Sequence, residues 1–206
     1  MLSACAVWPI PVAELREYAI WGGVPRYWEL RRDYPDKETA IRKVLLDPQG
    51  PLIEEPQRLL RDDMRDTVQA STLLTIIGNG ANKLSEIATR AGKDSSTISE
   101  PLSKLRELGY VSREVPFGES PKKSKKGIYH INDSLLRFHY QFIVPYRSIL
   151  ELGRMDMVMQ VVLAQLPQFI GQCWELLRPV WLKLRNRKGR SSWELLGFQP
   201  VAIIQF

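Results

Sequence analysis

The sequence predicts a mainly α-helical protein: a lid-like array of short helices, then a winged helix-turn-helix with a two-stranded wing, then further helices. Two observations support this prediction. Apolar residues recur at helical spacing along most of the 206 residues. Near the middle of the chain, three segments with this helical spacing precede two stretches in which polar and apolar residues alternate. The chain has room for one medium domain or two small ones. We divide it into residues 1–65, 66–133 and 134–206.

The first segment is predicted to contain four helices. Gly22 and Gly23 end the first of them, and Pro25 opens the second, because a proline in the first turn of a helix removes no hydrogen bond. A run of proline and glycine between residues 48 and 51 separates the third helix from the fourth. The expected helices span residues 12–22, 24–30, 37–46 and 52–65.

The middle segment is predicted to begin with three helices. The first covers residues 67–77 and stops at a double-glycine turn, and the second covers 84–91 and ends at Gly92. Asp94 or Ser95 is expected to cap the third helix by accepting hydrogen bonds from its free amides. Gly109 closes that helix, and its inward stripe is formed by apolar residues at spacings of three and four, namely Ile98, Leu102, Leu105 and Leu108.

Two strands are predicted at residues 110–117 and 128–131, joined by a lysine-rich loop. A lysine run alone usually indicates a solvated loop, but its place at the tip of a wing favours contact with a nucleic acid. Each neutralised phosphate releases counterions, so such a wing would give salt-sensitive affinity that does not depend on sequence. The net charge of +6 agrees with a polyanionic partner. The wing lysines are Lys122, Lys123, Lys125 and Lys126.

The outward face of the third helix is the second candidate contact with nucleic acid. Short hydroxyl side chains can approach base edges in the major groove, and lysines beside them can bind phosphates. The same hydroxyls also serve as helix caps and solubilising residues, and the first turn lacks the arginine or asparagine that makes the strongest base contacts. Base readout and capping therefore both stay open. The candidate residues on and before this helix are Lys93, Ser95, Ser96, Thr97, Ser99 and Lys104.

The last segment is predicted to hold helices at residues 134–144 and 149–165, with Pro145 and Pro167 as interruptions. Four aromatic residues lie at helical spacing in and after the first of these helices. They are either core residues or a surface that faces a protein partner. These aromatic residues are Phe138, Tyr140, Phe142 and Tyr146.

Several function classes are disfavoured by what the sequence lacks. The phosphate-binding motif GxxxxGK followed by serine or threonine is missing, so autonomous ATP hydrolysis is not expected. Cys5 and Cys173 form no zinc motif, and His130 and His139 have no predicted catalytic partner. The apolar runs are shorter than the roughly 18 residues of a membrane span, and no basic start suggests a signal peptide. We predict a cytoplasmic non-enzyme without metal, cofactor or membrane partner.

Several stretches together resemble the C-terminal half of an archaeal-type ATPase of the AAA family, in its STAND-related group. Residues 18–27, YAIWGGVPRY, are similar to the GG(V/I)P signature of the family's helical lid. Residues 96–111 are similar to its winged-helix core, and residues 125–133 and 136–143 to the wing exit and the helix after it. The resemblance implies an ATPase core followed by a lid, a winged helix and a nuclease-like domain.

The chain departs from this family pattern in two places. The ATPase core is absent, and the match to the nuclease-like domain stops after residues 169–175, FIGQCWE. A metal-dependent nuclease needs further acidic residues, whereas Glu194 is the only carboxylate side chain after Glu175. Residues 176–193 are instead basic. That stretch is either a second nucleic-acid patch or a terminus altered by truncation or a shift of reading frame.

Three functions follow as hypotheses. The first is a winged-helix fragment of an AAA-family ATPase that binds nucleic acid, with duplex DNA as the expected partner. The second is an interaction module that docks on a separate ATPase partner or forms a homo-oligomer. The third, ATP hydrolysis by the chain itself, is disfavoured by the missing phosphate loop.

Overall fold

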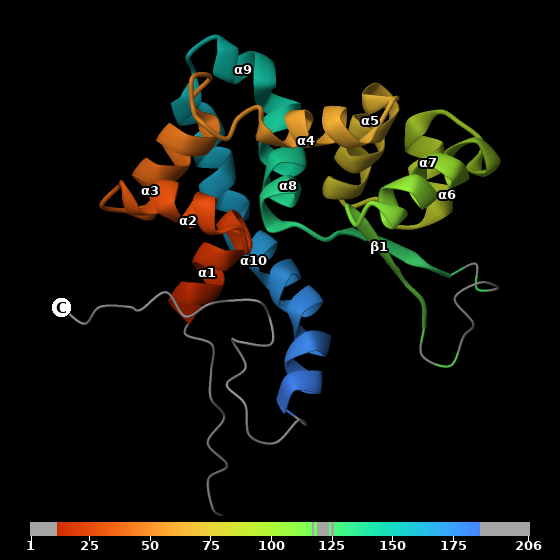
Figure 1. Cartoon of the computed structure of the whole chain (residues 1–206). Helices are drawn as coiled ribbons and strands as arrows, with labels where there is room; N and C mark the ends of the chain where they lie inside the picture. The colour runs from red at the N-terminus through yellow and green to blue at the C-terminus, as the bar shows by residue number, and fades with distance from the viewer. Residues whose placement is uncertain (1–11, 117, 119–123, 125, 186–206) are drawn as a thin grey trace, which may run out of the picture.

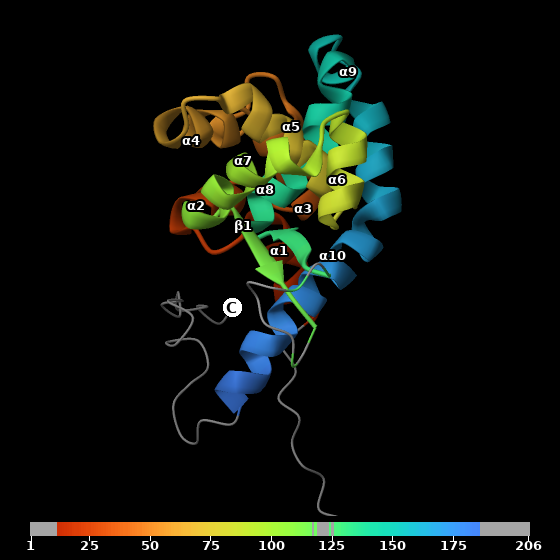
Figure 2. The ribbon, with the colours of Figure 1, turned by 90° about the vertical axis from the view of Figure 1, so that its right-hand side faces the viewer.

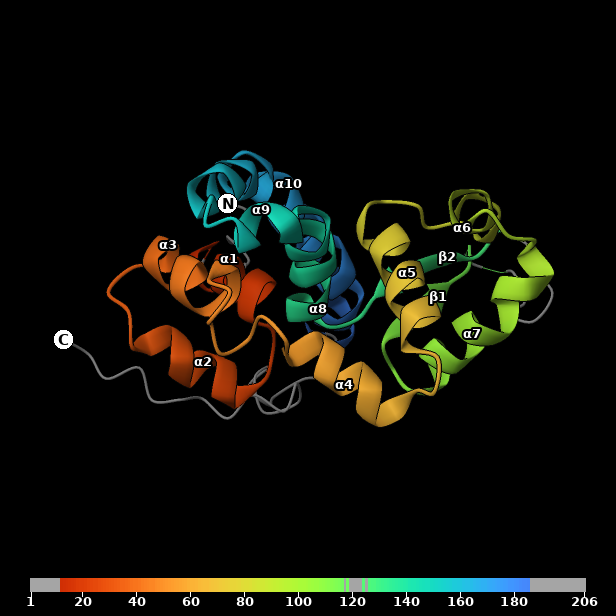
Figure 3. The ribbon, with the colours of Figure 1, turned by 90° about the horizontal axis from the view of Figure 1, so that it is seen from above.

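The computed structural model describes residues 12–116, 118, 124 and 126–185, with side chains up to residue 176. Within these residues the protein is mainly helical and carries one antiparallel hairpin, as the sequence predicts. Figure 1 shows the N-terminal helices and the long α10 on one side and the winged helix on the other. Figure 3 shows α4 linking the two parts and α8 lying between them.

The N-terminal helices follow the expected order. Asp36 caps α3 by accepting from the amide of Thr39 at 2.8 Å, and α3 continues directly into a π-helical turn, η1. The sequence pattern does not predict the π-helical turn, because a single turn with i→i+5 hydrogen bonds is too short to change the apolar pattern visibly. The elements are α1 (Val12–Trp21), α2 (Pro25–Arg32), α3 (Lys37–Ala40), η1 (Ile41–Leu46) and α4 (Glu55–Asp63).

Three helices and a hairpin form the winged helix. Gly92 ends α6 with a φ of 63°, in the left-handed conformation that glycine adopts without strain. Tyr110 at the start of the hairpin donates from its hydroxyl to Asp63 at 2.6 Å, which fixes the winged helix to the end of α4. The elements are α5 (Thr67–Gly78), α6 (Leu84–Ala91), α7 (Ser95–Glu107), β1 (Val111–Glu114) and β2 (Ile128–Ile131).

The hairpin register follows the alternation of the sequence. Val111 pairs with Ile131, and both side chains are buried against the three helices. A bridge between Lys83 and Ile128, with the amide of Tyr129 donating to the carbonyl of Asn82 at 2.7 Å, holds β2 against the segment before α6. The wing is therefore anchored along its inner half.

The C-terminal segment differs from the prediction. The helix expected at 149–165 is two helices separated near Gly153, and the second continues through Pro167 without ending there. Pro167 lies on the exposed side of that helix, while Leu166 and Phe169 beside it are buried, so packing outweighs the roughly 3 kcal/mol that a proline costs. The elements are α8 (Ser134–Phe138), the π-helical η2 (His139–Ile143), the 3-10 turn η3 (Val144–Tyr146), α9 (Arg147–Glu151) and α10 (Met155–Arg185).

Two apolar cores lie side by side. The first combines α1 and η1 with α10, so residues 169–175, which resemble the start of a nuclease-like domain, belong to a helix that packs on the N-terminal array. The second lies inside the winged helix and includes Leu60 of α4. Leu135 and Phe138 contribute to the first core, while Leu136 and Tyr140 contribute to the second. The continuous helix formed by α8 and η2 therefore connects the cores.

The glycine turn after α1 packs against the start of α8. Gly22 is buried with a φ of 66°, its amide donates to Tyr18 at 2.9 Å, and its carbonyl accepts from the indole of Trp28 at 2.9 Å. A Cβ added at Gly22 would lie 3.4 Å from a carboxylate oxygen of Asp133. Two of the stretches that resemble the ATPase family therefore meet at this turn, and both have a structural role there.

We expect Gly22→Ala to lower the free energy of unfolding by about 1 to 2 kcal/mol, because a Cβ is strained at positive φ. Gly23→Ala is the matched control, since Gly23 is exposed and has no positive φ. Urea unfolding of both variants measures the difference. Equal midpoints for the two variants would contradict this account of the turn.

Candidate nucleic-acid interface

Helix α7 has one buried face and one polar face, as predicted. Ile98, Leu102 and Leu105 are buried, while Leu108 is only partly buried. Of the predicted contact residues, Ser95 is half-buried, and those exposed on or just before the helix are Lys93, Ser96, Thr97, Ser99 and Lys104. The structure thus brings all six to the outer side of one helix and the turn before it.

The turn before α7 forms a shallow hollow that joins two of the candidates. Lys93 and Thr97 line it together with Thr89, Gly92 and Asp94. Asp94 takes the N-cap position, but its side chain accepts no hydrogen bond from the helix, contrary to our expectation. Its backbone carbonyl accepts instead from the amides of Thr97 and, at longer range, Ile98.

One of the predicted hydroxyls is already engaged with the backbone. The hydroxyl of Ser99 donates to the carbonyl of Ser95 at 2.6 Å, so its proton is used inside the helix and its oxygen is left to accept. Ser96 and Thr97 project from the preceding turn and are exposed. These two residues are therefore the better placed hydroxyls for contact with a base edge or a phosphate.

Acidic residues reduce the positive potential of α7. Glu100 and Glu107 are exposed on the same helix, and the carboxylate of Glu107 lies 4.0 Å from the ammonium of Lys104. Exposed pairs of this kind are weak, so Lys104 can exchange Glu107 for a phosphate. The helix alone nevertheless carries little net charge, and the main attraction for a polyanion has to come from the wing.

The wing is only partly described. Lys126 is exposed, and its amide donates to the hydroxyl of Ser124 at 3.1 Å. The predicted contacts Lys122, Lys123 and Lys125 lie outside the described residues. The position of Lys126 and the direction of the hairpin therefore locate the base of the wing.

Arg113 on β1 is a residue that our sequence reasoning missed. Its guanidinium lies 5.9 Å from the ring centre of Tyr129, the residue opposite it on β2, and donates to the carbonyl of Ser124 at 2.5 Å. A Cβ added at Gly127 would overlap this guanidinium, so the arginine passes directly over the backbone of that glycine. The sequence alone could not indicate this contact, because the pairing of Arg113 with Tyr129 depends on the register of the two strands.

The hairpin and α7 lie on the same side of the molecule. β1 packs against α7, and Figure 2, which views that side, shows α6, α7 and β1 facing the viewer with the hairpin extending below. One extended polyanion can therefore reach both elements. The hairpin is not covered by the N-terminal helices in any of the three views (Figures 1, 2 and 3).

The aromatic residues after the hairpin are core residues. Phe138, Tyr140 and Phe142 are fully buried, and Tyr146 is partly buried. The rings of Phe138 and Phe142 are 4.9 Å apart, and Phe169 of α10 packs edge-on against both. The first three aromatic residues are therefore not available to a protein partner.

The two histidines occupy different environments. Burial lowers the pKa of the half-exposed His130, and deeper burial lowers that of His139 to about 3. Within the part of the chain that the structure describes, no group of three or more histidine, cysteine, aspartate or glutamate residues could hold a metal ion. Burial therefore accounts for the lowered pKa of each histidine.

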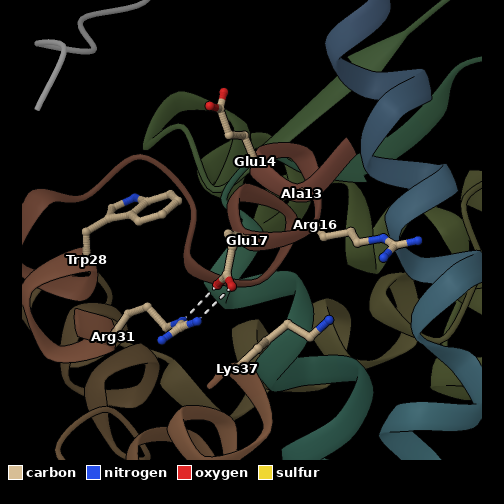
Figure 4. A pocket seen from close by; sticks show the side chains of 7 residues that line it. All are labelled: Ala13, Glu14, Arg16, Glu17, Trp28, Arg31 and Lys37. Atoms are coloured by element: carbon tan, nitrogen blue, oxygen red, sulfur yellow. Dashed lines mark hydrogen bonds and ion pairs between the residues drawn. The ribbon is translucent and has the colours of Figure 1, made fainter. Parts of the chain in front are cut away.

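A second hollow, lined by Trp28, lies between α1 and α2 (Figure 4). Its two convergent charged groups bind each other, since Arg31 donates through Nε and Nη2 to the two carboxylate oxygens of Glu17, both at 2.9 Å. The indole of Trp21 also donates to Glu17 at 2.9 Å. This arrangement joins two helices, and we assign no ligand to it.

Comparison with known proteins gives one relative. No protein-family model and no solved structure matches the chain. The chain is similar to an uncharacterized protein of the archaeon Methanocaldococcus jannaschii, with 29% identity over 205 residues. The alignment covers 91% of this chain and 45% of the relative, so the chain spans less than half of the relative's length.

This alignment bears on the basic end of the chain. The alignment leaves out about 9% of this chain, which is fewer than the 21 residues that follow Arg185. Even if all of the unaligned residues lie at the C-terminus, the alignment includes the whole of α10. The similarity therefore extends past Glu175, where the resemblance to the ATPase family ends.

None of the helices in the described residues is long and apolar enough to cross a membrane.

Proposed function

We propose that the chain binds duplex DNA through its winged helix, and that it acts as a binding module without catalytic activity of its own. The observation that carries this proposal is the exposed polar face of α7 beside a hairpin whose loop contains four lysines. The helix presents Ser96 and Thr97, and the hairpin, which has the exposed Lys126 just before β2, lies on the same side. A cytoplasmic location is part of this proposal.

The charge distribution indicates which DNA contacts come from the wing and which come from helix α7. Phosphate contacts position a protein on a duplex and supply most of its salt-dependent affinity. Because Glu100 and Glu107 offset the charges of Lys104 and Arg106 on α7, these contacts come chiefly from the wing. The hydroxyls of α7 then contribute at close range, where a short side chain lets the helix approach the groove.

The decisive experiment replaces the wing lysines. We expect K122A/K123A/K125A/K126A to weaken binding to all duplex sequences alike, and to reduce the slope of log affinity against log salt by about 3 to 4 units. Fluorescence anisotropy with two unrelated labelled duplexes between about 50 and 200 mM salt measures both effects. The matched control removes four exposed cations elsewhere, as R26A/R32A/K43A/R154A.

The outcomes separate cleanly. A wing variant that behaves like the control would contradict the assigned surface, and binding that does not respond to salt would contradict a phosphate-based mode. A wild-type chain with no affinity for either duplex would remove the DNA-binding function itself.

A second candidate is docking on a separate ATPase partner or on another copy of the chain. The relative is more than twice as long as the region it shares with this chain, which favours a role beside further domains. This function predicts co-purification with an ATPase subunit, or a homo-oligomer in light scattering, together with no affinity for DNA. Affinity for DNA that the wing lysines control would decide against it.

A further inference from the structure

The outer face of α10 carries no charge along most of its described length. No charged residue lies between Asp156 and Glu175, whereas charged residues make up 25% of the whole chain. The inner side of this stretch is buried in the first core, but its outer side is exposed and includes two large apolar side chains, Met157 at 52% and Leu163 at 38%. Helix faces in contact with water usually carry charges, and charged residues are depleted at the centre of protein interfaces. This face is therefore typical of a surface that another protein covers.

Five exposed residues follow the middle of this face, and we call them the α10 strip. Residues three or four positions apart on a helix lie on the same side. Such steps lead from Met157 through Gln160, Ala164 and Gln168 to Gly171. Ala164 is the centre of the strip, because the two glutamines are four positions to either side of it and the two end residues are seven.

This arrangement makes the strip complementary to a second copy of itself. When two copies meet in antiparallel orientation at Ala164, Gln160 of one lies opposite Gln168 of the other, and amide side chains both donate and accept hydrogen bonds. Met157 of each copy then lies opposite Gly171 of the other, where the missing side chain leaves room for the long one. The small Ala164 at the crossing point allows the two helices to approach closely.

The two ends of the face carry opposite charges. Exposed Arg154 is ten positions before Ala164, and exposed Glu175 is eleven positions after it. In the antiparallel arrangement, Arg154 of each copy lies near Glu175 of the other, once at either end of the contact. A carboxylate accepts several donors, so Glu175 can make this contact in addition to any within its own chain. A parallel arrangement would place like charges together, which is unfavourable.

We propose that the α10 strip is a dimer interface, on which a second copy of the chain binds in antiparallel orientation. The uncharged face is about 27 Å long and one helix wide, which is at the low end of specific interfaces, so we expect a Kd on the order of 10 μM. In Figures 1 and 3, α5 lies between α10 and α7, so this contact is separate from the proposed DNA interface. The inference goes beyond the proposed function and does not rest on it.

The test places a charge at the centre of the strip. Ala164→Glu brings two carboxylates together in the dimer and keeps a good helix former, and Ala13→Glu makes the same change at an exposed alanine of α1. Sedimentation velocity without DNA, at protein concentrations of about 1 to 100 μM, measures association. We expect Ala13→Glu to dimerise like the wild-type chain and Ala164→Glu to associate on the order of 100-fold more weakly. Circular dichroism verifies that both variants fold.

A second pair of variants tests the orientation. R154E and E175R each place like charges at both ends of an antiparallel dimer, so each variant alone should associate about threefold to tenfold more weakly. An equal mixture of the two restores one pair of opposite charges at each end, and its heterodimer should recover the wild-type affinity. A mixture that associates no better than either variant alone would contradict the antiparallel register.

The outcomes for the dimer and for DNA binding are separate, because sedimentation uses no DNA. A wild-type chain that stays monomeric at the highest concentration, or an Ala164→Glu variant that associates like Ala13→Glu, would overturn the dimer. If the wing variant loses DNA affinity while the wild-type chain is monomeric, the DNA-binding function stands and this inference is wrong. A dimer that Ala164→Glu disrupts, in a chain without affinity for DNA, would support this inference and remove the DNA-binding function.

Discussion

We expect Phe138→Ala to lower the free energy of unfolding by about 3 to 5 kcal/mol, the usual cost of removing a buried phenylalanine ring. Phe138 is fully buried, 4.9 Å from the ring of Phe142 and 5.8 Å from that of Phe169 on α10. The guanidinium of Arg137 lies 4.6 Å from the Phe169 ring, so the cavity would also loosen a buried cation. Urea unfolding followed by circular dichroism gives the change.

The same variant tests whether the two cores are coupled. Because α8 and η2 contribute side chains to both cores, we expect a single transition whose midpoint shifts as a whole. Leu152→Ala is the control, since its side chain is 73% exposed and its loss should cost less than about 0.5 kcal/mol. A change of under 1 kcal/mol for Phe138→Ala, or two separate transitions in the wild-type chain, would contradict this description.

The winged helix could be predicted from the sequence because its signals are local. The spacing of Ile98, Leu102 and Leu105 sets one face of α7, and alternation at 128–131 sets β2. Pro167 shows where local rules fail. Its ring disfavours a helix, but the buried residues on either side hold α10 together, and that packing partner is some 150 residues away in α1.

The sequence predicts which residues of α7 are exposed, but it does not predict the side-chain contacts around them. The exposed hydroxyls and lysines of α7 follow from its apolar stripe, since residues off the stripe face solvent. The contacts of Arg113 with Tyr129 and Ser124 depend on the strand register. The side chain of Asp94 makes no cap hydrogen bond to α7, although its residue type favours one.

The second large effect concerns acid stability and His139. This residue lies in the π-helical η2, is 1% exposed, and has no hydrogen-bond partner for either ring nitrogen among the described residues. Burial, helped by the positive charge of Arg147, lowers the pKa of His139 to about 3 from an ordinary value of 6.5. The unfolded chain therefore takes up a proton at a higher pH than the folded chain does.

The sign of the pH dependence follows from that difference. Above pH 6.5 both states leave His139 neutral, and as the pH falls from 6.5 towards 3 only the unfolded state gains the proton, so stability falls. The loss amounts to about 2 kcal/mol at pH 5, at 1.36 kcal/mol per unit of pKa. His130, whose pKa is also lowered by burial, acts in the same direction, whereas the buried Asp133, whose pKa burial raises, acts in the opposite one.

Replacing His139 isolates its share of this effect. We expect His139→Phe to keep a folded structure, because the ring packs edge-on to Tyr140 at 5.2 Å, and to lose about 2 kcal/mol less than the wild-type chain between pH 7 and pH 5. Urea midpoints at the two pH values measure this, and His139→Leu serves if the larger ring does not fit. An unchanged pH dependence in the variant would show that His139 is protonated in the folded state, and so that η2 opens to water before the cores unfold.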